Sequence, residues 1–213
     1  MNDKKTLLSS FAWKFSERLL SQGIGLVIQI LIARMIKPEA VGEMAILLSV
    51  INIFSVIAQS GFSSYIIQKK DLTEEAISSV ATFSILIAIG CIGLFWLFGD
   101  FLMAFLGYPQ LGIYLKVAGT MLLFNAINSV LMGLLSKQMQ FKEMFFRTLI
   151  VLPLSAIVCF ALMMNGMDIE ALIAYNVVNP FFTTVFLAQL LKKSEYKIRL
   201  KIDARELKYA LPY

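Results

Sequence analysis

The chain has 213 residues, of which 59% are hydrophobic and only 15% are charged, with a net charge of +5. Soluble globular proteins carry about a quarter charged residues, so this composition is typical of a membrane protein. The chain has no histidine and only two cysteines, Cys91 and Cys159, which leaves zinc, haem and Ser-His-Asp chemistry without their usual ligands and bases. We therefore predict no metal, no cofactor and no enzymatic activity.

Six long apolar stretches follow one another along the chain, at residues 19–36, 43–62, 79–99, 115–136, 146–164 and 170–191. Each approaches the ~20 residues that a helix needs to cross ~30 Å of hydrocarbon. The runs are continuous and lack the alternation of outer-membrane strands. The predicted fold is an all-α integral membrane protein, a bundle of six transmembrane helices.

The segments between the first three stretches carry signals of turns and helix ends. Residues 37–42 form a tight connection in which Pro38 is suited to opening the second helix. Gly61 is a predicted helix stop. Asp71, three residues before Glu74, is typical of a cap for a short surface helix that runs into the third span.

Two later connections differ in character. Residues 101–111 are apolar and aromatic and are predicted to lie flat on the outer leaflet. Residues 137–143 are predicted to form an amphipathic connector in the inner interface. Pro153 and Pro180 fall inside the fifth and sixth stretches, where they favour bends.

The basic residues are distributed unequally between alternate sides of these stretches. One side holds only Arg34, Lys37 and Lys116. Such a bias in short loops places the richer side in the cytoplasm, together with both chain ends. The charge is therefore explained by membrane topology and gives no indication of nucleic-acid binding. The richer side holds sixteen of the nineteen Lys and Arg residues: Lys4, Lys5, Lys14, Arg18, Lys69, Lys70, Lys137, Lys142, Arg147, Lys192, Lys193, Lys197, Arg199, Lys201, Arg205 and Lys208.

Two parts are predicted along the chain. Residues 1–191 form a transmembrane lobe of six spans. Residues 192–213 form a basic cytoplasmic linker, after which the hydrophobic pattern restarts at Tyr209, as at the start of a truncated seventh span.

Four of the predicted helices carry a seam of polar, mostly uncharged side chains along one face, calculated at 100° per residue. Any one such residue is explained most simply as hydrogen-bonding glue between helices. Four seams together favour a shared water-filled cavity. Its candidate lining residues are Arg18, Gln22, Gln29, Asn52, Gln59, Asn125, Asn128, Asn176 and Asn179.

Two observations bear on the cargo of such a cavity. Arg18 lies at the foot of the first seam, where it either extends toward the headgroups or anchors a phosphate. Asp and Glu are expected only at span edges, as at Glu17 and Glu43, which argues against exchange of cations or protons. A polar cavity without carboxylates suits an anionic, sugar-rich cargo.

Four short segments carry a family resemblance. The run LIARMIKPEAVG at residues 31–42 resembles the LAR-x-L-x-P-E-x-x-G signature of bacterial polysaccharide exporters. The segments GFSS at 61–64 and IIQKK at 66–70, and QFK at 140–142, are also similar to that family. These are the O-antigen, teichuronic-acid and colanic-acid flippases of the multidrug/oligosaccharidyl-lipid/polysaccharide exporter superfamily.

This resemblance implies two lobes of six or seven helices around a central cavity, in the bacterial cytoplasmic membrane. Family members have twelve to fourteen spans, so the chain resembles the amino-terminal lobe alone, and a carboxyl-terminal lobe or a second copy would complete the cavity. The implied function is flipping of undecaprenyl-diphosphate-linked oligosaccharide repeat units for surface polysaccharide. The implied partners are that substrate, membrane lipids, and polysaccharide polymerase and assembly proteins.

Two alternatives remain open. A multidrug or cation extruder of the same superfamily requires a functional buried carboxylate. A non-transporting scaffold for polysaccharide assembly requires the polar seams to be packed and dry, so that water-soluble reagents would not reach cysteines placed at Asn52 and Asn128.

Overall fold

The computed structural model describes residues 2–59, 62–69 and 71–191. These residues form helices and turns and contain no β-strand. Six helical segments are long and apolar enough to cross a membrane, as the sequence predicted. The predicted helix stop at Gly61 and the predicted linker and seventh span at 192–213 lie outside the described residues. The helices are α1 (Asn2–Met35), α2 (Pro38–Gln59), α3 (Phe62–Gln68), α4 (Glu74–Phe105), α5 (Gly112–Gly119), α6 (Met121–Lys137), α7 (Phe141–Met163) and α8 (Ile169–Leu191), with a 3₁₀ turn at Pro109–Leu111.

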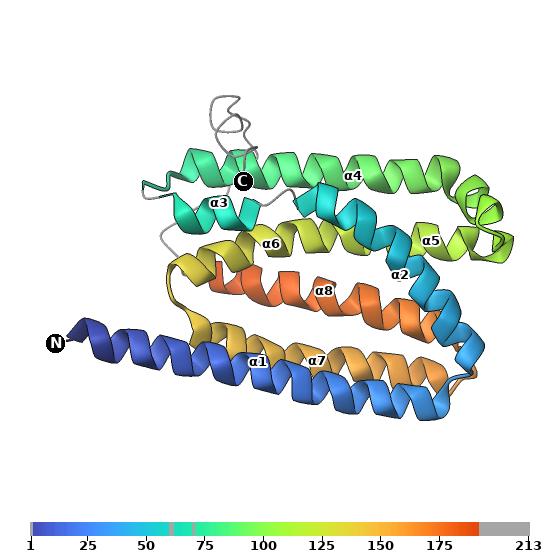
Figure 1. The fold of residues 1–213 in the computed structure, drawn as a ribbon, viewed down its shortest axis with the longest axis horizontal. Coiled ribbons are helices and arrows are strands. Elements are labelled where there is room, and N and C mark those ends of the chain that lie inside the picture. The colour runs from blue at the N-terminus through green and yellow to red at the C-terminus, as the bar shows by residue number, and fades with distance from the viewer. Residues whose placement is uncertain (1, 60–61, 70, 192–213) are drawn as a thin grey trace.

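The long helices lie nearly side by side in a flattened bundle (Figure 1). α4, the α5–α6 pair, α8 and α7 follow one another across it, and α1 lies on α7 at the margin. α2 leaves the end of α1 and crosses obliquely to pack on α4, α5, α6 and α8. α1 therefore packs mainly on one neighbour, whereas α6 packs on several.

We call the end at which α1 begins the amino-terminal end, and the opposite one the distal end. Trp13 of α1 stacks edge-on against Phe145 of α7 at 5.4 Å between ring centroids. Leu187, near the end of α8, packs with Met144 at the start of α7. α1 thus begins, and α8 ends, at the same end of the bundle.

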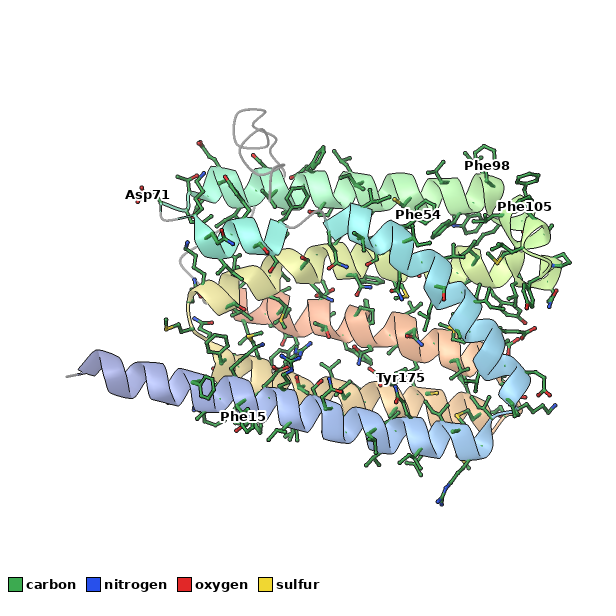
Figure 2. The ribbon with its side chains drawn as sticks, in the orientation of Figure 1. Phe15, Phe54, Asp71, Phe98, Phe105 and Tyr175 are labelled. Carbon is green, nitrogen blue, oxygen red and sulfur yellow. The ribbon has the colours of Figure 1, made fainter. Side chains whose placement is uncertain are left out.

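The core is formed mainly by α2, α4 and α6. Leu47, Ile51 and Leu122 are fully buried in it. Phe54 of α2 meets the buried Phe95 of α4 edge-on at 4.7 Å (Figure 2). Apolar side chains also cover the outside of the bundle, as on the distal part of α4, because that surface faces lipid in a membrane protein.

Helix ends differ from the prediction where no residue breaks the helix. α1 begins at Asn2, long before residue 19, because residues 2–22 contain no glycine or proline. α4 likewise continues to Phe105, so the expectation that residues 101–111 lie flat as one segment was wrong. The chain reverses after it through Gly107, whose φ of 87° suits glycine.

The cap of α4 was also assigned to the wrong residue. The hydroxyl oxygen of Thr73 accepts a hydrogen bond from the backbone N–H of Ala76 at 3.2 Å, whereas Asp71 was expected to cap. Thr73 immediately precedes the first helical residue, which is the position from which a side chain reaches the free N–H groups. Asp71 lies two residues too early.

Three further features were not anticipated. The fourth span is interrupted at Thr120, whose hydroxyl donates to the carbonyl of Val117 at 2.7 Å between α5 and α6. Residues 62–68 form the short helix α3, which approaches α6 closely at Gly133. The connector at 137–143 is a turn at residues 138–140, with Met139 at a φ of 54°.

Candidate functional site

The candidate residues of α1 lie on an exposed flank of that helix. Arg18, Gln22 and Gln29 are all exposed, whereas Ile28 and Ile32 are buried where α1 faces the bundle. At 100° per residue the three polar side chains share one side of the helix. We call them the α1 polar flank. A membrane-spanning helix that exposes amides and a guanidinium over this length needs water or another polar surface beside it.

On α2, Asn52 is also exposed. Gln59 is partly buried, and its amide nitrogen donates to the hydroxyl oxygen of Ser55 at 2.6 Å. This bond joins neighbouring turns of one helix, so it links α2 to no other element.

The candidate residues of α6 are deeper in the bundle. Asn128 is buried; its amide nitrogen donates to the carbonyl oxygen of Pro180 at 2.9 Å, and its amide oxygen accepts from the hydroxyl of Thr184 at 2.9 Å. Both partners belong to α8. Asn128 therefore joins two packed helices, the simpler explanation that the sequence left open for each seam residue. Asn125, one turn earlier, is partly buried.

The two candidate residues of α8 differ in their hydrogen bonds. The amide nitrogen of Asn176 donates to the carbonyl of Leu172 at 2.9 Å within the helix. Asn179 is partly buried, and its buried amide nitrogen has no hydrogen-bond partner within the described part of the chain. Buried amide donors are nearly always satisfied in native proteins, so this group marks a place where water or a ligand would fit.

The structure therefore places the nine predicted residues in two kinds of environment. The α1 polar flank and Asn52 are exposed on helices that diverge from each other (Figure 1). Asn128 is packed between helices, and the others are partly buried. A cavity lined by all of these residues would need a further polar surface opposite α1 and α2.

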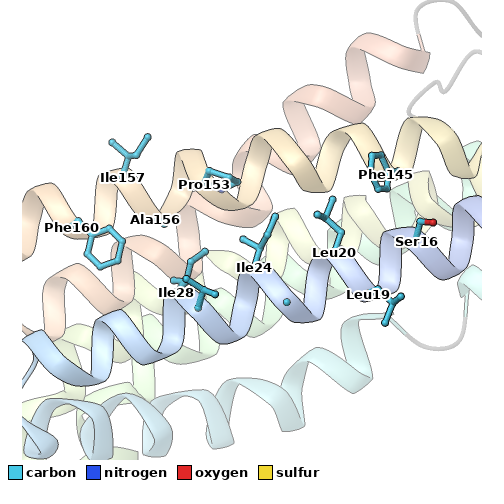
Figure 3. A pocket seen from close by; sticks show the side chains of 12 residues that line it. Ser16, Leu19, Leu20, Ile24, Ile28, Phe145, Pro153, Ala156, Ile157 and Phe160 are labelled. Carbon is cyan, nitrogen blue, oxygen red and sulfur yellow. The ribbon is translucent and has the colours of Figure 1, made fainter.

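A cavity of about 780 Å³ lies elsewhere, along the contact between α1 and α7 (Figure 3). Leu20 and Ile24 of α1 and Pro153 and Phe160 of α7 form its walls, and none of the nine predicted residues lines it. Gly23 widens it, because no atom lies within 4 Å of the position that a β-carbon would occupy there. The lining is almost entirely hydrocarbon, so the cavity suits an apolar chain and no glycan.

A charged cluster that was not predicted from the sequence lies between α1 and α7. Glu17 is only 7% exposed and receives contacts from two cations and a hydroxyl. One carboxylate oxygen lies 3.2 Å from the ammonium of Lys14. The other lies 3.4 Å from the guanidinium of Arg147 and 3.2 Å from the hydroxyl of Thr148. We call these four residues the Glu17 cluster.

Glu17 was predicted to lie at the edge of the first span. The first apolar helical segment runs from Phe11 to Met35 and includes Glu17, because α1 begins before residue 19. The spacing of Lys14 and Glu17, three residues apart on a helix, was a local signal of a pair. Arg147 is 130 residues away in sequence, so its contribution could not be read from spacing.

A second set of polar contacts lies at the distal end of the bundle. The hydroxyl of Tyr114 in α5 donates to the carboxylate of Glu170 in α8 at 2.7 Å. Lys116 pairs with Asp100 of α4 at 2.5 Å. These bonds tie α5 to its neighbours at a predicted interface with water, where polar side chains carry little cost.

Comparison with known proteins assigns this bundle to a family. Residues 31–213 match the family described as polysaccharide biosynthesis protein. The chain belongs to that family. The matched region begins near the end of α1 and includes every later helix, together with Arg147 and Thr148 of the Glu17 cluster.

One curated protein that is similar in sequence to this chain is the succinoglycan biosynthesis transport protein ExoT of Rhizobium meliloti (strain 1021). The two are 26% identical over 171 residues, which cover 80% of this chain and 34% of the relative. The chain thus spans about one third of the length of the curated relative that it matches. No solved structure matches the chain significantly.

Proposed function

We propose that the chain is one lobe of a membrane transporter. It moves lipid-linked oligosaccharide repeat units from the inner to the outer leaflet of the bacterial cytoplasmic membrane during surface polysaccharide synthesis. Membership of the polysaccharide biosynthesis family and the name of the succinoglycan relative support export of a glycan. Six helical segments of membrane-spanning length support a place in the membrane, and the relative is named as a transport protein.

The observation that carries the proposal is the α1 polar flank. Exposed amides on a membrane-spanning helix are costly in lipid, so the flank faces water or the polar wall of a second lobe. Gln22 and Gln29 offer donors and acceptors that match sugar hydroxyls. Arg18 offers two parallel N–H donors to a phosphate.

The charge distribution supports one orientation. Lys14, Arg18, Lys137 and Lys142 lie toward the amino-terminal end, where α1 and α7 begin and α6 ends. Arg34, Lys37 and Lys116 belong to the distal side. By the positive-inside rule the amino-terminal end faces the cytoplasm. The exposed Arg18 then lies near the inner leaflet, where a lipid-linked diphosphate would be collected.

A complete cavity needs a second wall, because α1 and α2 leave their polar side chains exposed. A further lobe or a second copy of this chain would provide it. The neighbouring proteins that this function implies are the polysaccharide polymerase and the assembly proteins that receive the flipped unit.

The test is a translocation assay on the longest in-frame protein that contains these 213 residues, reconstituted in liposomes with a fluorescent undecaprenyl-diphosphate oligosaccharide. We expect Arg18→Ala and the double variant Gln22→Leu, Gln29→Leu to slow flipping at least about tenfold, as expected for loss of polar contacts that a buried site requires. A matched control is Val27→Leu, on the hydrocarbon-lined side of α1. Unaltered rates in both polar-flank variants would contradict the proposal.

One observation favours a second candidate, a multidrug or cation extruder. Glu17 is a buried carboxylate inside a span, which such a transporter requires. Its pairing with both Lys14 and Arg147 leaves little affinity for a further cation, so we rank this candidate second. Efflux of a fluorescent lipophilic cation that disappears in Glu17→Gln would reverse the ranking.

A further inference from the structure

The cations of the Glu17 cluster outnumber its anion. Lys14 and Arg147 carry two positive charges, and Glu17 carries one negative charge. The side chains of Glu17 and Arg147 are only 9% and 16% exposed. The side chain of Lys14 is 45% exposed, so the unbalanced positive charge of the cluster lies where an anion can approach it from outside the bundle.

The hydrogen-bonding capacity of Arg147 is also incompletely used. The contact between its guanidinium and Glu17 measures 3.4 Å, longer than the ~2.7–2.9 Å of a strong charge-assisted bond. The same terminal nitrogen donates to the hydroxyl of Thr148 at 2.8 Å. The Nε–H group of Arg147 is buried and has no partner in the part of the chain that the structure describes. Because the second carboxylate oxygen of Glu17 faces Lys14, Glu17 satisfies the guanidinium of Arg147 only in part.

We propose that Lys14, Arg147 and Thr148 form a binding site for the diphosphate of a lipid, and that Glu17 occupies this site as an internal counter-ion until the lipid displaces it. A phosphate group has more oxygens than a carboxylate and can accept from the guanidinium Nε and Nη groups together. The inference rests on the proposed function and names a second anion site beside Arg18.

The location of the site favours a lipid over a free anion. The site lies inside the segment Phe11–Met35, next to Trp13, whose ring packs against Phe145. An indole ring beside charged groups is typical of the headgroup level of a membrane. The diphosphate of a lipid can bind at the headgroup level while its chain stays in the hydrocarbon of the membrane. A free anion would first have to lose its surrounding water, which costs free energy.

The counter-ion mechanism predicts that two substitutions at the Glu17–Arg147 contact change the affinity for the anion in opposite directions. Removing the charge of Glu17 frees the cations, so Glu17→Gln should tighten binding of the anion about tenfold, as expected for loss of one like charge near 4 Å. Removing the charge of Arg147 deletes the main donor, so Arg147→Gln should weaken binding by at least about tenfold. A purely structural ion pair would give losses in both variants.

The experiment measures binding to the protein in zwitterionic phosphatidylcholine nanodiscs, through the fluorescence of Trp13 in a Trp96→Phe background. The probes are farnesyl diphosphate, farnesol and inorganic diphosphate. We expect saturable binding of farnesyl diphosphate, no effect of farnesol, and binding of inorganic diphosphate at least about tenfold weaker, because it lacks the apolar chain. Equal affinities for the two diphosphates would overturn the lipid assignment.

The matched control is Lys142→Gln, which removes a cation at the same end of the bundle that stacks on Phe146 and takes no part in the cluster. We expect its affinity to stay within about twofold of the unaltered protein, since an exposed charge at this distance is screened by salt. Weaker binding in both Glu17→Gln and Arg147→Gln would overturn the counter-ion mechanism. The translocation assay with Arg18→Ala is independent of this binding experiment. If the Glu17 cluster does not bind the lipid diphosphate, the proposed transport function still stands. If the translocation assay fails, the cluster is a lipid-binding site in a protein without transport activity.

Discussion

The α1–α7 interface and the α6–α8 interface both bury polar groups within membrane spans, and they do so in different ways. Between α6 and α8, the neutral amide of Asn128 donates one hydrogen bond and accepts another, each at 2.9 Å. Between α1 and α7, two cations share one carboxylate and a guanidinium N–H remains unpaired. The first arrangement is satisfied within the bundle, and the second is not.

The two interfaces also differ in how tightly their helices pack. α6 is surrounded by α2, α3, α4 and α8, whereas α1 packs mainly on α7 and leaves a cavity of about 780 Å³ along the contact. Complete packing and satisfied polar groups are typical of a structural interface. Incomplete packing and an unpaired guanidinium N–H are the observations on which the proposed binding site at the α1–α7 interface rests.

The largest expected effect on stability is at Arg147. Arg147→Met leaves the carboxylate of Glu17 buried with only Lys14 as a charged partner, and removal of one member of a buried pair costs about 3–5 kcal/mol. We expect the unfolding free energy in detergent to fall by about 3 kcal/mol. The double variant Glu17→Met, Arg147→Met should recover most of this loss, because no buried charge remains without a partner. Equal losses in the single and double variants would show that packing, and not charge, is responsible.

The next effect concerns the close contact of α5 with α4. A β-carbon at Gly119 would lie 2.6 Å from the ring of Phe95, which is 1% exposed. Because that ring has no room to move, we expect Gly119→Ala to lower the unfolding free energy by about 2 kcal/mol through overpacking. Thermal unfolding of the purified protein measures this, and a midpoint equal to that of the unaltered protein would mean that the core yields easily.

A smaller effect is expected at Asn128. Asn128→Leu removes both bonds to α8 and should cost about 1 kcal/mol, since hydrogen bonds between membrane helices contribute about 0.6 kcal/mol each on average. Thr184→Val removes only one of the two bonds and should cost about half as much. A loss of transport without a loss of stability in Asn128→Leu would place this residue in the cavity after all.

The smallest effect is expected at Gly23, the counterpart of Gly119 on the open interface. No atom lies within 4 Å of a β-carbon placed there. We expect Gly23→Ala to leave stability unchanged or to raise it by less than about 1 kcal/mol, through the better helix propensity of alanine. A clear destabilisation, measured beside Gly119→Ala, would show that α1 and α7 pack more tightly than the cavity between them indicates.

The sequence predicted what depends on local pattern. The six spans follow from hydrophobic runs, and Pro38 opens α2 because its backbone has no N–H to lose. The rotation of each helix in the bundle could not be predicted in the same way. Asn52 and Asn128 have similar seams around them, yet one is exposed and the other is bonded to α8, because tertiary packing determines which face is covered.

The missed Glu17 cluster has two causes. The start of the first span was inferred from its apolar residues, whereas the helix extends through the polar residues before it. The partner Arg147 comes from a distant helix, and contacts over such separations are not encoded in residue spacing. The cap at Thr73 was missed for a smaller reason, an offset of two residues.

The most direct test of a water-filled pathway beside α1 is cysteine labelling in membranes, at positions on both sides of α1 and on α2 and α6. Cys91 and Cys159 are first replaced by alanine in the full-length protein. We expect a membrane-impermeant thiol reagent to modify Gln22→Cys and Asn52→Cys, while Val27→Cys and Asn128→Cys stay unmodified. Protection of Gln22→Cys and Asn52→Cys from the reagent on both sides of the membrane would contradict a water-filled transport pathway beside α1.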